Sequence, residues 1–228
     1  MRGRFREWLR VPRMTKAKRP LPSTVVLLVR HGLTPTTGVK LPGRAAGLHL
    51  SDEGRKQAEN AAERIAKIDK VVAIYSSPLE RARETAGIIA KSRHQAVRIE
   101  RGLLELNIGK FTGMALKDAH KAPEWQAIQQ HPSGFHFPGG ESFTEMQTRI
   151  TGAIARMVAR HAGRIVVAVS HADPIKAAVA HALGTPLDLF QRIMIGTASI
   201  SAIAYSPSGA ALLTVNSMDG DLAALGIK

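Results

Sequence analysis

Cysteine is absent from this 228-residue sequence, and its absence excludes several kinds of site. Disulfide scaffolds, thiolate zinc sites, iron–sulfur clusters and cysteine nucleophiles all need the missing thiol. Aromatic residues are also scarce, at 4% of the chain, and they are not clustered. Sequence-specific RNA binding depends on aromatic side chains that stack on bases. We therefore expect no nucleic-acid partner.

Long apolar runs are missing as well. A membrane-spanning helix needs about 20 consecutive apolar residues, and no run in this chain approaches that length. The first residues carry charge but lack the apolar stretch of a secretory signal. Together with the lack of cysteine, which fits a reducing compartment, these absences predict a soluble cytoplasmic protein.

Negative charge is in short supply, because 32 Lys and Arg face 18 Asp and Glu, for a net charge of +14. Half of this excess lies in residues 1–22, which hold eight cations and one anion. We expect these residues to form a disordered basic extension in front of a single domain, residues 23–228. Other interpretations stay open: translation starts at Met14, or Phe5, Trp8 and Leu9 form an apolar helical face that makes weak contact with an anionic membrane, or the extension has an organellar or nucleic-acid role.

The hydrophobic pattern of the domain alternates between strands and helices. Continuous apolar, β-branched runs predict strands covered on both faces at 24–29, 71–75 and 165–170, with a weaker strand at 97–100. Helices are expected at 52–68, 78–91, 116–129 and 143–161 and from 174, and a C-terminal hairpin at 200–205 and 211–216. This alternation predicts an α/β fold, a three-layer αβα sandwich with a mostly parallel central sheet.

Polar residues predict where several of these helices begin. Three serines are expected to cap helices, two of them in capping boxes with a glutamate three positions later: Ser51, Ser142 with Glu145, and Ser77 with Glu80. Pro78 would then occupy a first helical position, which suits proline. Asp173 is expected to cap the helix that begins at Pro174.

Ionisable residues follow each strand that is expected to be parallel. In such sheets ligands bind beyond the carboxyl ends of the strands. The segments at these ends are Arg30-His31-Gly32, Ser76-Ser77-Pro78 leading to Arg81, Leu104-Glu105-Leu106, and Ser170-His171-Ala172.

This set of side chains suits the transfer of a phosphoryl group. A neutral His31 can attack phosphorus, and Arg30, Arg81 and His171 can compensate the charge on the phosphoryl oxygens. Glu105 can protonate the leaving alcohol and then deprotonate the acceptor. This chemistry requires no metal and no cofactor, and we expect neither.

In these motifs the sequence resembles the histidine phosphatase superfamily, which includes the cofactor-dependent phosphoglycerate mutases. The resemblance covers residue 24 to about residue 214 and implies a phosphoglycerate mutase-like fold with a phosphohistidine at His31. Within the superfamily the chain is most similar to an actinobacterial subgroup labelled as phosphomutases by inference. The resemblance rests on five motifs in order: Arg30-His31-Gly32, residues 76–82 with Thr85-Ala86, Leu104-Glu105 with Gly109 and Gly113, residues 138–142, and Ser170-His171.

The resemblance implies further contacts to phosphate or substrate. Gly32 belongs to the first motif, and Thr37 stands where many members have Asn, so it can offer one hydrogen bond. Gly43 and Arg44 lie in what looks like the family's loop over the substrate. For Glu141, a helix-capping role and a direct role in the site both stay open.

The function we expect is hydrolysis of a small phosphorylated metabolite, whose identity depends on the variable segment 102–141. A phosphomutase is the first alternative. It is less favoured because only about 206 residues follow the extension, fewer than in the insert-bearing mutases that the chain resembles. The second alternative is a catalytically silent module that binds a phosphorylated or nucleic-acid ligand. The sequence does not determine the oligomeric state.

Overall fold

A computed structural model describes residues 23–225 of the chain. The predictions for residues 1–22, namely the disordered basic extension, the membrane contact and the start at Met14, therefore lie outside the described residues. No helix in the described part is long and apolar enough to cross a membrane.

A six-stranded sheet forms the centre of the molecule, in the order β3-β2-β4-β1-β5-β6. The first four strands in sequence pair in parallel, and β5 and β6 add an antiparallel hairpin beside β1. The predicted α/β class and mostly parallel sheet are confirmed. The strands are β1 Thr24–Arg30, β2 Val71–Ser76, β3 Val97–Ile99, β4 Ile165–Ser170, β5 Ile200–Ser206 and β6 Gly209–Ser217.

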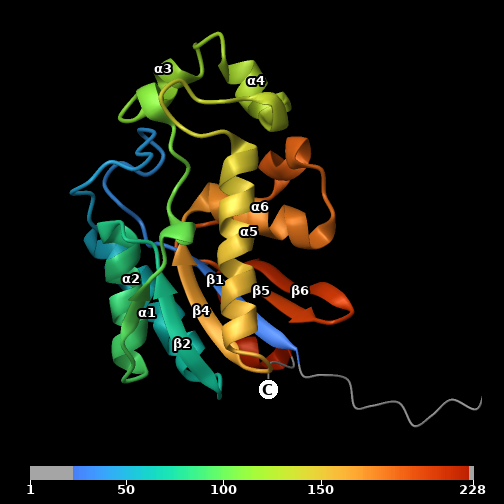
Figure 1. Ribbon diagram of the computed structural model, residues 1–228. Coiled ribbons are helices and arrows are strands. Elements are labelled where there is room, and N and C mark those ends of the chain that lie inside the picture. The colour runs from blue at the N-terminus through green and yellow to red at the C-terminus, as the bar shows by residue number, and fades with distance from the viewer. Residues whose placement is uncertain (1–22, 226–228) are drawn as a thin grey trace, which may run out of the picture.

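Helices cover both faces of this sheet, as the three-layer prediction requires (Figure 1). Alternate residues of β1 enter two separate cores because successive strand side chains point to opposite faces. One core includes side chains of α1 (Asp52–Ala66) and α2 (Glu80–Ser92), and the other includes side chains of α5 (Phe143–Arg160) and α6 (Ala172–Leu183).

Two of the predicted helix caps are confirmed. The Ser51 side chain accepts from the backbone of α1, and Ser142 forms the predicted capping box with Glu145. The predicted cap at Ser77 is wrong, since Leu79 is the N-cap of α2 and no side chain caps that helix. Ser77 instead directly follows β2, and its backbone N–H donates to the carbonyl of Val169 in β4.

Two further details of the helices differ from the predictions. The predicted cap at Asp173 is wrong, since the N-cap position of α6 is His171, whose side chain makes no capping hydrogen bond, and Asp173 lies in the first turn. The single helix predicted at 116–129 is two short ones, α3 (Leu116–Ala119) and α4 (Trp125–Gln130). Pro123 lies between them, where its missing N–H and the restriction on the preceding residue oppose a continuous helix. Both short helices lie above one end of the sheet (Figure 1).

Candidate functional site

Strand register brings the predicted histidines to the same level of the sheet. Arg30 in β1 pairs with Ser170 in β4, so His31 and His171 are the next residues of two neighbouring strands. Their rings lie edge to face, with centroids 5.1 Å apart. Ser76 in β2 pairs with Val169, so the carboxyl ends of three parallel strands meet here.

His31 is buried, with 4% of its surface exposed, and its two ring nitrogens have different partners. Nδ1 lies 2.8 Å from the carbonyl oxygen of Gly32, and Nε2 lies 3.3 Å from Nε of Arg81. The carbonyl can only accept and the guanidinium can only donate, so the proton belongs on Nδ1 and the lone pair on Nε2. Burial, and then the charges of Arg81 and Arg30, hold the pKa of His31 well below its usual value. The imidazole is therefore neutral, and its lone pair is on Nε2, where it accepts the hydrogen bond from Arg81.

Two arginines beside His31 have donor groups to spare. Arg81 is fully buried and donates from Nη2 to the carbonyl of Gly43, while Arg30 donates from Nη1 to the carbonyl of Ile195. Three of the buried nitrogens without a hydrogen-bond partner in the described part of the chain are Arg30 Nε, Arg81 Nη1 and His171 Nδ1. An unpaired buried donor costs about 1–3 kcal/mol. An oxyanion beside His31 would satisfy such donors and offset that cost.

His171 is fully buried, and its Nε2 lies 2.8 Å from Oγ of Ser77. Burial, and then the neighbouring His31 and Arg81, lower the pKa of His171 well below its usual value, so it is neutral in the free site. The sequence pattern around Ser77 predicted a helix cap and not this contact. The only signal available was its place directly after a predicted strand.

Glu105 lies across from His171, with its Oε2 4.0 Å from Nδ1 of that ring. Its Oε1 accepts a hydrogen bond from the N–H of Leu106 at 2.9 Å. Burial first, and then repulsion from Asp173, raise the pKa of Glu105 to about 7, against the opposing effect of Arg81. The carboxyl group can therefore both donate and accept a proton near neutral pH. The sequence pattern predicted Asp173 only as a helix cap and not as a residue of the site.

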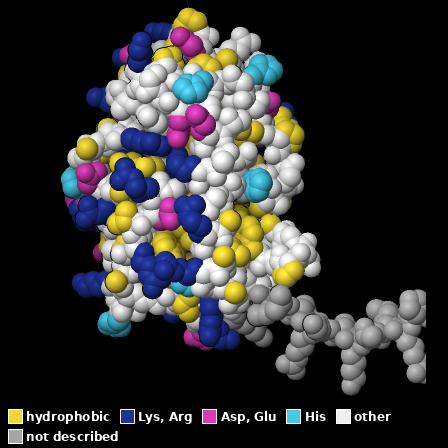
Figure 2. All heavy atoms as spheres, viewed as in Figure 1, with side chains coloured by type: hydrophobic (Ala, Val, Ile, Leu, Met, Phe, Trp, Pro, Cys, Tyr) yellow, Lys and Arg dark blue, Asp and Glu magenta, His cyan; other side chains and the backbone are white. Residues whose placement is uncertain are grey.

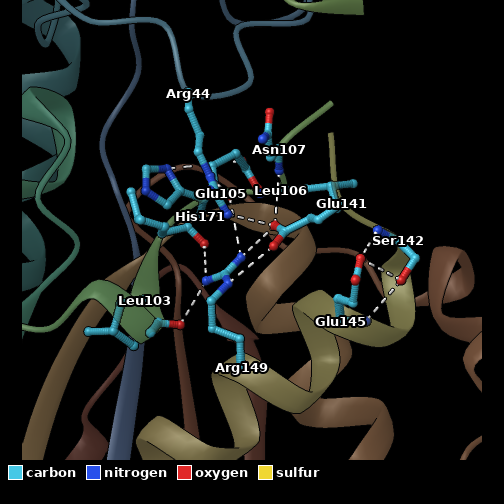
Figure 3. Close-up of polar contacts among 12 residues, drawn as sticks. Arg44, Leu103, Glu105, Leu106, Asn107, Glu141, Ser142, Glu145, Arg149 and His171 are labelled. Carbon is cyan, nitrogen blue, oxygen red and sulfur yellow. Dashed lines mark hydrogen bonds and ion pairs between the residues drawn. The ribbon is translucent and has the colours of Figure 1, made fainter. Parts of the chain in front are cut away.

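A bridge of two arginines and one glutamate holds the segment that carries Glu105 (Figure 3). Glu141 Oε1 lies 2.7 Å from Nη2 of both Arg44 and Arg149. Arg149 also donates to the carbonyls of Gly102 and Leu104, at 2.9 and 2.8 Å. Arg44 donates from Nε to the carbonyl of Glu105 at 2.7 Å.

The Arg44–Glu141–Arg149 bridge contains two residues that the sequence motifs singled out and one that they did not. Arg44, which was expected to contact substrate, uses its guanidinium on Glu141 and on the carbonyl of Glu105, and Glu141, for which a helix cap and a role in the site were both open, lies between the two arginines. Arg149 was missed because it lies in the middle of α5, outside every motif.

The other residues predicted to contact phosphate or substrate, namely Gly32, Thr37 and Gly43, form hydrogen bonds with other groups of the protein. The N–H of Gly32 donates to Oγ1 of Thr85, and a side chain at Gly32 would collide with the backbone of Gly54. Thr37 Oγ1 accepts from the N–H of Thr34 at 3.1 Å. Gly43 has a φ of +46°, which favours glycine, and this turn presents its carbonyl to Arg81.

A cavity of about 210 Å³ lies at this site, and its lining includes Arg30, His31, Thr37, Gly43 and Glu105. A larger hollow of about 550 Å³ lies beside α2 and β3 and contains none of the predicted site residues. No group of three or more His, Cys, Asp or Glu side chains in residues 23–225 is placed to hold a metal ion.

The sequence matches the profile of the histidine phosphatase superfamily (branch 1) over residues 26–218. The chain belongs to this superfamily. It is 32% identical over 196 residues to phosphoserine phosphatase 1 of Hydrogenobacter thermophilus. This alignment spans 84% of this chain and 91% of that protein. It is 36% identical over 155 residues to phosphoglycerate mutase-like protein 4 of Arabidopsis thaliana, spanning 66% and 67% of the two chains.

Solved structures agree with this membership. A mycobacterial glucosyl-3-phosphoglycerate phosphatase superposes with a TM-score of 0.77 at 26% identity, over 86% of this chain and 99% of that one. The YhfR protein of Bacillus stearothermophilus gives a TM-score of 0.78 at 26% identity, over 89% and 99% of the two chains.

Proposed function

We propose that this protein is a phosphatase that hydrolyses a small phosphorylated metabolite through a phosphohistidine at His31. One observation carries the proposal: a buried neutral imidazole with its lone pair on Nε2 lies beside guanidinium groups that have unpartnered donors. Relatives named as phosphoserine phosphatases and a neighbour named as a glucosyl-3-phosphoglycerate phosphatase support hydrolysis of a phosphomonoester.

In the first step Nε2 of His31 attacks phosphorus, and the bond between phosphorus and the ester oxygen breaks. Arg30 and Arg81 offer positive charge and hydrogen bonds to the phosphoryl oxygens as charge shifts, and Nδ1 of the neutral His171 offers a further hydrogen bond in the tautomer that carries its proton there. The protonated Glu105 gives its proton to the leaving oxygen, so the alcohol departs neutral. The products are phosphohistidine, the alcohol and a Glu105 carboxylate.

In the second step water attacks the same phosphorus atom and the N–P bond breaks. The Glu105 carboxylate takes a proton from the water, which restores the acid. Inorganic phosphate leaves, and Nε2 of His31 regains its lone pair. A pKa of about 7 suits a carboxyl group that must act as an acid in one step and a base in the next.

The alternative phosphomutase uses the same phosphohistidine but returns the phosphoryl group to a second hydroxyl of a retained substrate. Hydrolysis is favoured by the phosphatase names among the relatives and neighbours. Phosphate release and isomer formation, measured on the same substrate, separate the two reactions.

The charge of the domain favours anionic substrates. Residues 23–228 hold 24 cations and 17 anions, and Lys and Arg side chains are spread over much of the face in Figure 2. A positive field of this kind raises the encounter rate with phosphorylated molecules. We propose the cytoplasm as the compartment, because charged phosphate esters do not cross membranes unaided.

The test of the mechanism is to trap labelled phosphate on the protein during turnover of a labelled phosphomonoester. We expect an acid-labile label in the wild-type chain and none in His31→Ala, whose phosphate release should fall at least ~1,000-fold. His181→Ala, which changes an exposed histidine in α6, is the matched control. Phosphate release by His31→Ala at the wild-type rate would overturn the mechanism. Ligand binding with neither label nor release would instead favour the silent binding module.

A further inference from the structure

A second cavity of about 180 Å³ adjoins the one that contains His31. The two cavities share four lining residues: Leu41, Leu106, Ile108 and Asp173. Glu105, the proposed acid for the leaving alcohol, is next in sequence to the shared Leu106. The second cavity is therefore placed where the body of the leaving alcohol would extend from the phosphoryl group.

The walls of the second cavity are predominantly apolar. Beyond the shared residues it is lined by Trp125, Ile128, Phe137 and Phe143, together with two glutamines. Phe137 and Phe143 are almost fully buried, and their rings lie 5.4 Å apart, so this part of the wall is fixed by packing.

The described walls of the second cavity offer no cation to an anionic occupant. None of its described lining residues is Lys, Arg or His, and the only charged one is Asp173. Asp173 lies 3.4 Å from Lys176, whose ammonium also donates to Gln191. A second anionic group on the substrate would find no cation on these walls, whereas an apolar group would leave water for an apolar surface.

The size of the cavity sets the size of its occupant. An engineered cavity of about 150 Å³, lined by Leu, Ile and Phe, binds benzene. The present cavity, at about 180 Å³, therefore has room for one aromatic ring or a branched alkyl group of similar volume.

We propose that the substrate is a phosphomonoester of an alcohol with one apolar group, and that this group occupies the cavity between α4 and the Phe137–Phe143 pair. This inference rests on the proposed phosphatase function, because it places the phosphoryl group at His31. It separates the expected substrate from amino-acid or sugar-acid phosphates, whose alcohols carry a second charge.

The experiment compares three phosphate esters on the full-length chain. Ethyl phosphate and 2-phenylethyl phosphate have primary alkoxide leaving groups of similar basicity and differ by one phenyl ring, and phosphoserine adds charge instead. We expect kcat/KM for 2-phenylethyl phosphate to exceed that for ethyl phosphate by roughly 10- to 100-fold, from the apolar area buried. We expect kcat/KM for phosphoserine to be lower than that for 2-phenylethyl phosphate. Equal values for the two alkyl esters, or a preference for phosphoserine, would overturn the inference.

Variants of the cavity wall test its location. Ile128→Trp fills the cavity and Trp125→Ala opens it, so each should lower the ratio between the two alkyl esters towards one. Circular dichroism and urea unfolding report whether each variant is folded. Gln126→Ala changes an exposed residue of the same helix and should keep the wild-type ratio. An unchanged ratio in both wall variants would contradict this location.

Binding of non-hydrolysable analogues distinguishes this inference from the proposed function. Calorimetry should show 3-phenylpropylphosphonate binding roughly 10- to 100-fold more tightly than propylphosphonate. If that preference is present but none of the esters is hydrolysed, the apolar cavity is supported and the phosphatase function fails. If the esters are hydrolysed but both phosphonates bind equally, the apolar cavity fails alone.

Discussion

Replacing Glu105 with Gln should make the stability of the protein less dependent on pH. Glutamine resembles the protonated carboxyl group in shape but cannot ionise. Burial and Asp173 raise the pKa of Glu105 from 4.5 to about 7, so the folded protein binds this proton more tightly than the unfolded chain does. The stability of the wild type therefore falls as pH rises from about 4.5 through about 7, and this contribution is absent from Glu105→Gln.

The pKa of Glu105 sets the size of the effect. The difference between 4.5 and about 7 corresponds to about 3 kcal/mol in full. About 2 kcal/mol of it falls between roughly pH 5.5 and 8.5. Glu105→Gln should gain stability relative to the wild type by about that amount across this interval.

Urea unfolding of both proteins at several pH values measures this quantity. Because the unfolding free energies of the two proteins are compared at each pH, contributions from titrating groups that do not interact with Glu105 cancel. Glu59→Gln, at an exposed position of α1, supplies the control and should run parallel to the wild type. A gap between wild type and Glu105→Gln that does not change with pH would refute the assigned environment of this carboxyl group. The same variant should hydrolyse alkyl phosphates about 100- to 10,000-fold more slowly, since it lacks the proton donor.

Two arginines give further predictions. Arg149→Met removes the hydrogen bond that holds the carbonyl of Leu104, so kcat should fall roughly 10- to 100-fold with an altered pH profile. Arg149→Lys should not restore kcat, because an ammonium lacks the guanidinium fork. An unaltered kcat and pH profile in a folded Arg149→Met protein would contradict this positioning role. Arg64 is buried in α1 and donates to three backbone carbonyls between Ser217 and Gly220. Arg64→Met should lower the free energy of unfolding by about 3–5 kcal/mol while leaving kcat/KM of the folded protein unchanged, as urea unfolding and a steady-state assay can check.

The sequence by itself determined the features that depend on neighbours along the chain. A buried strand needs only a continuous apolar run, and the cap at Ser51 needs only the N–H of Gly54 three residues later. The capping box at Ser142 is equally local. The residues that follow the strand ends were predictable for the same reason, because parallel strands place their carboxyl ends at one edge of the sheet. Their chemical roles stay predictions until the experiments above are done.

Only the tertiary structure decided the contacts between distant segments. Ser77 follows a local capping pattern, but its hydroxyl group binds His171, 94 residues away, while its backbone N–H donates to the carbonyl of Val169. Arg44 and Glu141 are 97 residues apart, and no periodicity in the sequence links them or adds Arg149. The second cavity likewise requires α4 to fold over the end of the sheet. Such pairings depend on how whole layers pack, so the substrate-selecting part of the site follows from the fold and not from any single motif.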